Sequence, residues 1–249
     1  MPVTTGPGGE TAGDPTGDAA PAPHSQTLSR GIRVLEVLAE RGAPMTIASI
    51  AAALGVHRSI AYRILRTLED HGLVVRDRSG SVQLGPRMAT LARSVSRDLQ
   101  AAALPQLTAV ANDLSMTAFL AVLDRRDVVT LVAVEPAHAH ASVAQRPGTR
   151  HPLASGAPGI AIQSALTDSQ WRTLPDEHPR DEAADARARG YATSHDEVIP
   201  GLASVAAPLA VTGQPVAAVA VVYVANGRDT AAIGARLAQA AAEIAADLR

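Results

Sequence analysis

A short segment around residue 60 carries hydrogen-bond donors and positive charges at helical spacing. Apolar residues at every third or fourth position define one side of a helix, namely Ala61, Ile64, Leu65 and Leu68. The opposite side carries Arg58, Ser59, Tyr62, Arg63 and Arg66. Donors near the start of a helix can reach base edges in the major groove of duplex DNA, and guanidinium groups bind phosphates and guanine. The pattern predicts base contacts from Arg58, Ser59 and Tyr62, with Arg63 and Arg66 on the flanking phosphates.

More basic residues flank this helix. His57 precedes it, and Arg76 and Arg78 follow it in a predicted hairpin. Residues 57–97 hold eight arginines against three acidic residues, although the whole chain has a net charge of −2. A basic stripe on a slightly acidic protein is typical of a duplex-binding module, so His57, Arg76 and Arg78 join the expected DNA contacts. The alternatives are a solvated face without a partner and a three-helix protein-interaction domain.

A second segment places small residues at the start of a predicted helix, namely Ser155, Gly156, Ala157, Pro158 and Gly159. Free amides at a helix N-terminus bind anions when no side chain obstructs them. Ser155 adds a hydroxyl donor, and Arg146, Arg150 and Ser204 are candidates to complete a site for a carboxylate. The alternative is that the glycines only form a turn and that Ser155 only caps the helix.

Other polar clusters do not favour a metal centre or an active site. His138 and His140 would share one face of a strand, but there is no cysteine and no acidic residue at a helpful spacing, which favours a surface loop. His195, Asp196 and Glu197 are interpreted as a charged loop. The nucleophile elbow, phosphate loop, dinucleotide fingerprint and zinc-hydrolase motifs are missing. We therefore expect no metal, no cofactor and no enzymatic activity.

Composition narrows the class of protein further. Among 249 residues there are one Phe, one Trp and three Tyr, which argues against stacking on single-stranded nucleic acid. The start of the chain lacks the basic segment and apolar run of a signal peptide. Residues 203–225 are the most apolar region, but Pro208, Gly213 and Pro215 interrupt them and indicate two strands rather than a membrane span. We expect a cytoplasmic protein without a membrane segment.

The chain divides into four predicted regions. Residues 1–26 are rich in Gly, Pro, Thr and Ala and are expected to be disordered. Residues 27–85 are expected to form a winged helix-turn-helix, 86–115 linker helices with a break at Pro105, and 116–249 a separate domain. The winged helix-turn-helix is expected to contain helices over 28–41, 46–54 and 57–71 and strands over 73–76 and 82–84.

The pattern of residues 116–249 mixes strands and helices, which predicts an α+β domain built on an antiparallel sheet. Strands are expected over residues 117–123, 128–135, 191–194, 204–210 and 216–224. Helices are expected over residues 159–166, 181–189 and 230–248.

Short motifs are spread over nearly all of the chain from Ser29 onward. In the first half they are Ser29–Leu35, Ile50–Val56, Tyr62–Leu68, Gly72–Val74 and Leu84–Arg87. In the second half they are Arg146–Arg150, Gly156–Gly159, Gly190–Ala192, Pro200–Gly201 and Ala206–Pro208. With these motifs the chain resembles the IclR family of bacterial transcription regulators, and the combination is specific although no single motif is.

The resemblance implies a GAF-like second domain that binds a small metabolite, often one that is aromatic or bears a carboxylate. It also implies dimers, or dimers of dimers, on palindromic operators. Glu197 matches a commonly acidic position near the effector pocket of the family. Ile60 and Ser204 depart from the family, which commonly has Thr and Cys at these positions, so the operator sequence and the ligand are not transferable.

We therefore expect a sequence-specific repressor or activator, a homodimer or tetramer, whose operator binding responds to a small-molecule effector. The expected effector-binding residues are Arg146, Ser155, Gly156, Ala157, Gly159, Glu197 and Ser204. The alternatives are a ligand-independent structural DNA-binding protein and an enzyme that transforms a small molecule and carries an appended DNA-binding domain.

Overall fold

The computed structural model describes residues 25–138, 143–174, 178–225 and 227–249, which form two compact units divided between residues 93 and 94. Each unit is described by itself. Two sequence predictions fall outside the described residues, namely the disorder of residues 1–24 and the placement of His140.

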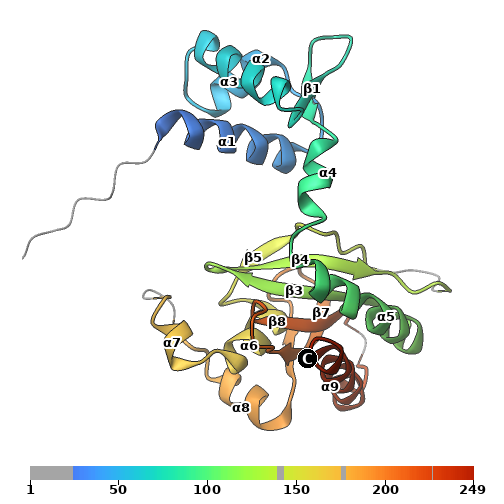
Figure 1. The fold of residues 1–249 in the computed structure, drawn as a ribbon. Helices are drawn as coiled ribbons and strands as arrows, with labels where there is room; N and C mark the ends of the chain where they lie inside the picture. Colours follow the sequence, from blue (N-terminus) through green and yellow to red (C-terminus); the bar gives the residue numbers. More distant parts are fainter. Residues whose placement is uncertain (1–24, 139–142, 175–177, 226) are drawn as a thin grey trace, which may run out of the picture. The chain divides into compact units, whose positions relative to one another are not determined.

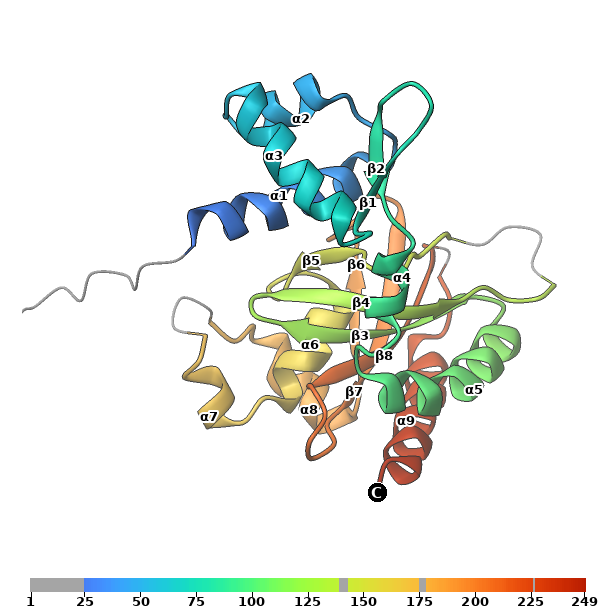
Figure 2. The same ribbon diagram turned by 45° about the horizontal axis from the view of Figure 1, so that its top comes forward.

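The first unit contains three helices, a two-stranded hairpin and one further short helix (Figure 1). Its elements are α1 (Gln26–Arg41), α2 (Ile47–Ala53), α3 (Arg58–Asp70), β1 (Val74–Arg76), β2 (Val82–Leu84) and α4 (Arg87–Ala92). Figure 2 shows the antiparallel hairpin beside α3. The predicted winged helix-turn-helix is confirmed.

Local sequence signals set the ends of these helices. Ser25 caps α1 by accepting a hydrogen bond from the Leu28 amide, and Gly42 ends it in the left-handed conformation with φ of 62°. Thr46 caps α2 by accepting from the Ser49 amide. The helices and the hairpin then share one apolar core, which contains Val34, Leu38, Ile50, Ile64, Leu65, Val74 and Val82.

The second unit is a six-stranded antiparallel sheet with helices on both faces (Figure 1). The strand order is β5-β4-β3-β8-β7-β6. The strands are β3 (Thr117–Asp124), β4 (Asp127–Val134), β5 (Arg150–Pro152), β6 (Ala192–His195), β7 (Leu202–Leu209) and β8 (Ala217–Val224). The helices are α5 (Arg97–Leu114), α6 (Gly156–Ala165), α7 (Asp168–Trp171), α8 (Glu182–Arg189) and α9 (Thr230–Asp247).

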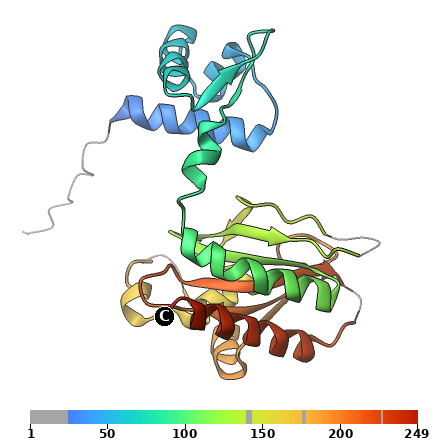
Figure 3. The same ribbon diagram turned by 45° about the vertical axis from the view of Figure 1, so that its right-hand side comes forward.

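The side chains of each strand point alternately to the two faces of the sheet, so this unit has two apolar cores, one on each face. In β3, Ala118 and Leu120 contact the layer formed by α5 and α9, whereas Phe119 and Ala121 contact the layer that contains α6. Successive side chains of a strand point to opposite faces, so a strand covered on both faces must be apolar throughout. Figure 3 shows α5 (green) and α9 (dark red) side by side along the sheet. The pocket described below lies on the other face, against α6.

Several sequence predictions differ from the structure. Helix α5 is not a linker, because Leu99, Ala103 and Leu107 are fully buried in the core of the second unit. The break falls at Ser96, which has φ of 44°, and Pro105 lies inside α5. Strand β5 and helix α7 were not expected, since three or four residues carry too little periodicity to be recognised. No helix in the described residues is both long and apolar enough to cross a membrane.

Replacing Gly159 by alanine should destabilise the second unit. The added Cβ would lie 2.3 Å from the carbonyl oxygen of Leu153, so α6 would have to move away from the segment that leads into it. Overpacking of this kind costs about 1–3 kcal/mol. Thermal unfolding followed by circular dichroism should show a lower Tm for this unit.

Gly31→Ala in α1 is the matched control. Its Cβ would lie 3.8 Å from Ile64 Cγ2, an ordinary contact, and alanine is favoured over glycine by about 1 kcal/mol inside helices. An unchanged Tm in the Gly159→Ala protein would contradict the close approach of α6 to Leu153.

Candidate functional site

Helix α3 presents a polar, basic face to solvent. Its inward residues Ala61, Ile64 and Leu65 are buried, and the outward residues are all exposed, namely Arg58, Ser59, Tyr62, Arg63 and Arg66. Ile60, which departs from the family pattern, is also 37% exposed. The predicted orientation of α3 is therefore present in the structure.

His57 and Ser59 organise the start of this face. The Ser59 amide donates a hydrogen bond to His57 Nδ1 at 3.3 Å, so Nδ1 is an acceptor and the Ser59 hydroxyl donates to it at 2.8 Å. His57 is thus the N-cap of α3, and the Ser59 oxygen keeps its capacity to accept a hydrogen bond.

Arg76 differs from the other predicted DNA contacts because its guanidinium is engaged within the protein. It forms an ion pair with Glu69 that includes a 3.0 Å hydrogen bond from Nη2, and it lies over the Tyr62 ring with Cζ 5.3 Å from the centroid. Arg76 therefore links strand β1 to the outward face of α3 and restricts the Tyr62 ring.

Arg78 lies at the turn of the hairpin and is exposed. The turn is held by Asp77, whose Oδ1 accepts hydrogen bonds from the Ser79 amide at 2.8 Å and the Ser81 amide at 3.0 Å. The hydrogen bond from the Ser79 hydroxyl, together with these amides, keeps the pKa of Asp77 below its usual value. The turn thus holds Arg78 on a defined loop.

The second candidate site is a small pocket on the α6 face of the sheet in the second unit. Its cavity volume is about 50 Å³. The lining residues are Phe119, Gln145, His151, Gly156, Pro158, Ser194, Glu197, Val198, Ile199, Leu202, Ala203, Ser204 and Val222. Apolar side chains form most of the wall, and the polar groups gather near the N-terminus of α6.

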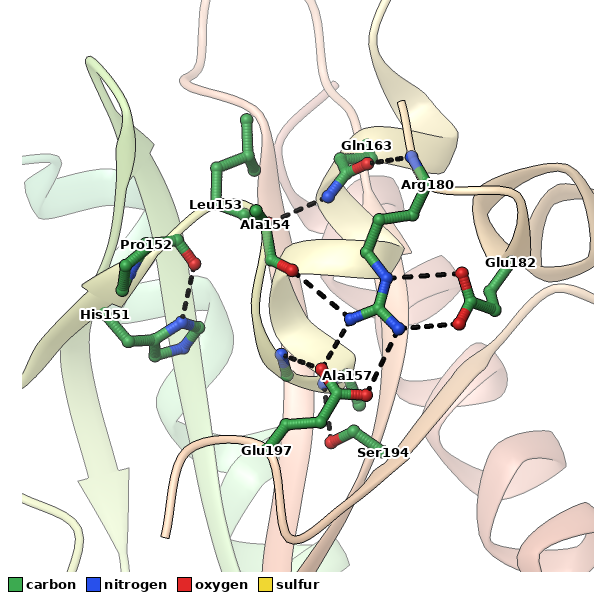
Figure 4. Close-up of polar contacts among 11 residues, drawn as sticks. His151, Pro152, Leu153, Ala154, Ala157, Gln163, Arg180, Glu182, Ser194 and Glu197 are labelled. Atoms are coloured by element: carbon green, nitrogen blue, oxygen red, sulfur yellow. Dashed lines mark hydrogen bonds and ion pairs between the residues drawn. The ribbon is translucent and has the colours of Figure 1, made fainter. Parts of the chain in front are cut away.

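The first two backbone amides of α6 are hydrogen-bonded to side chains of the protein, those of Glu197 and Ser194. The Gly156 amide donates to Glu197 Oε2 at 2.8 Å, and the Ala157 amide donates to Ser194 Oγ at 2.8 Å. Figure 4 shows the Glu197 carboxylate between this helix end and the Arg180 guanidinium. The anion-binding position predicted from the small residues is thus present, but a carboxylate of the protein occupies it.

Arg180 connects several segments at this end of the pocket (Figure 4). Its guanidinium pairs with Glu182 and with Glu197, and also donates to the Ala154 carbonyl oxygen at 3.2 Å. Hydrogen bonds to these two carboxylates raise the pKa of Arg180 further above its already high value. The backbone amide of Arg180 is held by Gln163, a buried side chain of α6.

His151 forms one side of the pocket. Its Nδ1 lies 3.1 Å from the carbonyl oxygen of Pro152, and burial lowers the pKa of the imidazole below its usual value. A neutral imidazole therefore predominates near neutral pH.

The predicted effector-binding residues are only partly brought together. Gly156, Glu197 and Ser204 line the pocket, whereas Ala157 and Gly159 lie in α6 next to it and Ser155 precedes the helix. The lining does not include Arg146 or Arg150. Arg146 is exposed, as is Arg150, which is paired with Asp124 at 2.7 Å and with Asp127 at 3.5 Å.

Sequence reasoning missed His151, Ser194 and Arg180. Ser194 faces Ser204 in the register of β6 and β7, so correct strand pairing would have identified it. His151 belongs to the unexpected strand β5, and no local signal marks Arg180. Within the described residues, no group of three or more metal-ligating side chains is arranged around a common point.

Comparisons with known proteins agree with this arrangement. Residues 27–78 match the model of the IclR helix-turn-helix domain, and residues 92–247 match that of the bacterial transcriptional regulator IclR C-terminal region. The chain is 33% identical over 233 residues to HTH-type transcriptional regulator Rv1719 of Mycobacterium tuberculosis. The aligned region covers 86% of this chain and 89% of the relative.

Solved structures show the same fold. A crystal structure of an IclR transcriptional regulator from Alicyclobacillus acidocaldarius has a TM-score of 0.77 at 27% identity and covers 90% of this chain and 99% of that chain. An IclR homologue from Microbacterium hydrocarbonoxydans, solved in complex with 4-hydroxybenzoate, has a TM-score of 0.76 at 25% identity with the same two coverages. The chain therefore belongs to the IclR family of bacterial transcriptional regulators.

Proposed function

We propose that α3 binds the major groove of an operator and that a small molecule in the pocket of the second unit changes this binding. The DNA-binding role is supported by α3, which exposes hydrogen-bond donors on its outward face and packs its inward face into the apolar core of the first unit. Arg58, Ser59 and Tyr62 face bases in this proposal, Arg63 and Arg66 the phosphates, and His57 and Arg78 the adjacent backbone. Arg76 has a positioning role, because its guanidinium is committed to Glu69 and Tyr62.

The ligand-binding role is supported by the pocket and by a relative. An apolar cavity with a few convergent polar groups is typical of small-molecule sites. The homologue solved with 4-hydroxybenzoate binds a small molecule, and its fold matches this chain over 90% of its length. These observations favour a ligand-responsive regulator over a ligand-independent structural DNA-binding protein. We propose no catalytic role.

We further propose that the protein acts in the cytoplasm as a homodimer, or as a pair of dimers, so that two α3 helices occupy successive major grooves. Leu28 and Ile32 on α1 are apolar and exposed, at 64% and 49%, which suits association between copies. Ligand binding would then change the population of the dimer that fits the operator.

Arg63→Ala and Arg66→Ala should each weaken binding to all duplexes alike. Each substitution removes one phosphate contact, so the slope of log K against log salt should become shallower by about 0.9. Fluorescence anisotropy with operator and random duplexes at several KCl concentrations measures both effects. Arg172→Ala, at an exposed site in the second unit, is the control. Wild-type slopes in the α3 variants would rule out phosphate contacts.

Ser59→Ala and Tyr62→Phe should instead change the preferred operator sequence. Each removes one hydroxyl from the outward face of α3, and Phe keeps the ring under Arg76. Discrimination at one or two base pairs should fall by about 1–3 kcal/mol. Affinities for an operator series with single base changes measure this. Thr67→Ala is the control, since its hydroxyl bonds to the Arg63 carbonyl within α3. An unchanged base preference would refute direct contacts.

Ser204→Trp should leave operator affinity intact but remove its response to ligand, because the indole would fill the pocket. Operator affinity is measured with and without a low-molecular-weight metabolite fraction from the producing cells. Ser169→Trp, at an exposed serine of α7, is the control. An equal response in both variants would show that the effector acts elsewhere.

A further inference from the structure

The amides that could bind a ligand carboxylate at the N-terminus of α6 are already used. The first helical residue, Gly156, donates to Glu197, and the second, Ala157, donates to Ser194. The third, Pro158, has no N–H group. An anionic ligand at this end would have to displace Glu197 from both the helix and Arg180.

The charges around the pocket also disfavour an anion. Glu197 is the charged side chain among the described residues that line it. Arg180, the arginine labelled in Figure 4, is not part of the lining and is engaged by Glu182, Glu197 and the Ala154 carbonyl. His151 does not supply a positive charge near neutral pH, because burial favours its neutral form.

The free accepting capacity of Glu197 requires a hydrogen-bond donor from the ligand. Glu197 Oε1 has one long hydrogen bond, at 3.3 Å from Arg180 Nη2, whereas Oε2 accepts two short ones. A carboxylate oxygen can accept about two hydrogen bonds, so Oε1 retains capacity. The rest of the wall combines apolar side chains, among them Phe119, Leu202 and Val222, with the neutral polar side chains of Gln145, His151, Ser194 and Ser204.

We propose that the pocket takes a small, uncharged molecule with an apolar body and a hydroxyl group that donates to Glu197 Oε1. An ammonium group at Oε1 would lie beside Arg180 Nη2, which donates to the same oxygen, so repulsion between like charges disfavours a cation. This proposal rests on the effector role of the pocket and names its ligand class. It differs from the carboxylate expected from the sequence, because the protein's own Glu197 occupies the place where that carboxylate would bind. The cavity volume of about 50 Å³ favours a small ligand.

Matched probes test the ligand class directly. The full-length protein is titrated at pH 7.5 with benzyl alcohol, benzoate and benzylamine, and with n-butanol, butyrate and butylamine, by isothermal titration calorimetry. The alcohol of each series should bind at least about ten-fold more tightly than its carboxylate, because a second anion would approach Glu197. Ser204→Trp should abolish the binding, which places it in the pocket.

Two variants identify the carboxylate responsible. Glu197→Gln should reduce the preference for alcohol over carboxylate to about three-fold or less, since it removes the charge that faces the ligand. Glu182→Gln is the matched control, because Glu182 bonds to the same guanidinium without lining the pocket, and the preference should persist. An equal loss of preference in both variants would refute a direct role for Glu197.

The proposal is overturned if a carboxylate or an ammonium probe binds as tightly as the alcohol, or if no alcohol binds in the pocket. Its failure can be separated from that of the proposed function. A carboxylate that binds in the pocket and changes operator affinity would refute only the ligand class. A metabolite response that survives Ser204→Trp unchanged would instead refute the proposed function.

Discussion

The carboxylate of Glu197 joins three segments of the second unit that are far apart in sequence. It accepts from the first amide of α6, pairs with the guanidinium of Arg180, and belongs to the loop that follows β6. The Glu197 side chain is 26% exposed, so water stabilises its charge together with Arg180 and the α6 amide. This junction holds the N-terminal end of α6 beside the pocket, while apolar packing against the sheet holds the rest of the helix.

In the first unit, too, an ion pair joins separate elements of the fold. Arg76 belongs to the basic stripe seen in the sequence, yet its guanidinium is held by Glu69 and by the Tyr62 ring. Because the pair joins β1 to α3, the hairpin and this helix are linked as one body. A count of arginines therefore overstates how many are free to contact phosphates.

Much of the fold could be predicted from local patterns. The helical spacing in α1 and α3, the cap at Thr46 and the long apolar runs of β3 and β8 each depend on neighbouring residues, and the structure has these elements close to their expected positions. Helix α5 was expected to be a linker because its apolar stripe predicts that the helix packs against something but does not identify the partner. In the structure the partner is the core of the second unit.

The polar end of the pocket was less predictable for a related reason. Arg150 and Arg180 look alike in sequence, and only the tertiary structure pairs the first with Asp124 at the surface and the second with Glu197 beside the cavity. The small residues Gly156 and Ala157 indicated a helix end with accessible amides, and the structure places Glu197 at the first amide and Ser194 at the second. Nothing local indicates that the carboxylate comes from 41 residues further along the chain.

Glu197 both holds the start of α6 and lines the pocket, and this double role limits how the ligand specificity of the protein can change during evolution. Mutation at Glu197 would alter chemical selectivity and loosen α6 together, so selection cannot tune one property while sparing the other. The part of the apolar wall formed by Val198 and Ile199 is under no such restriction, because these residues lie on an exposed loop and can vary in size. Homologues that keep this carboxylate should therefore diverge in ligand shape more readily than in ligand charge.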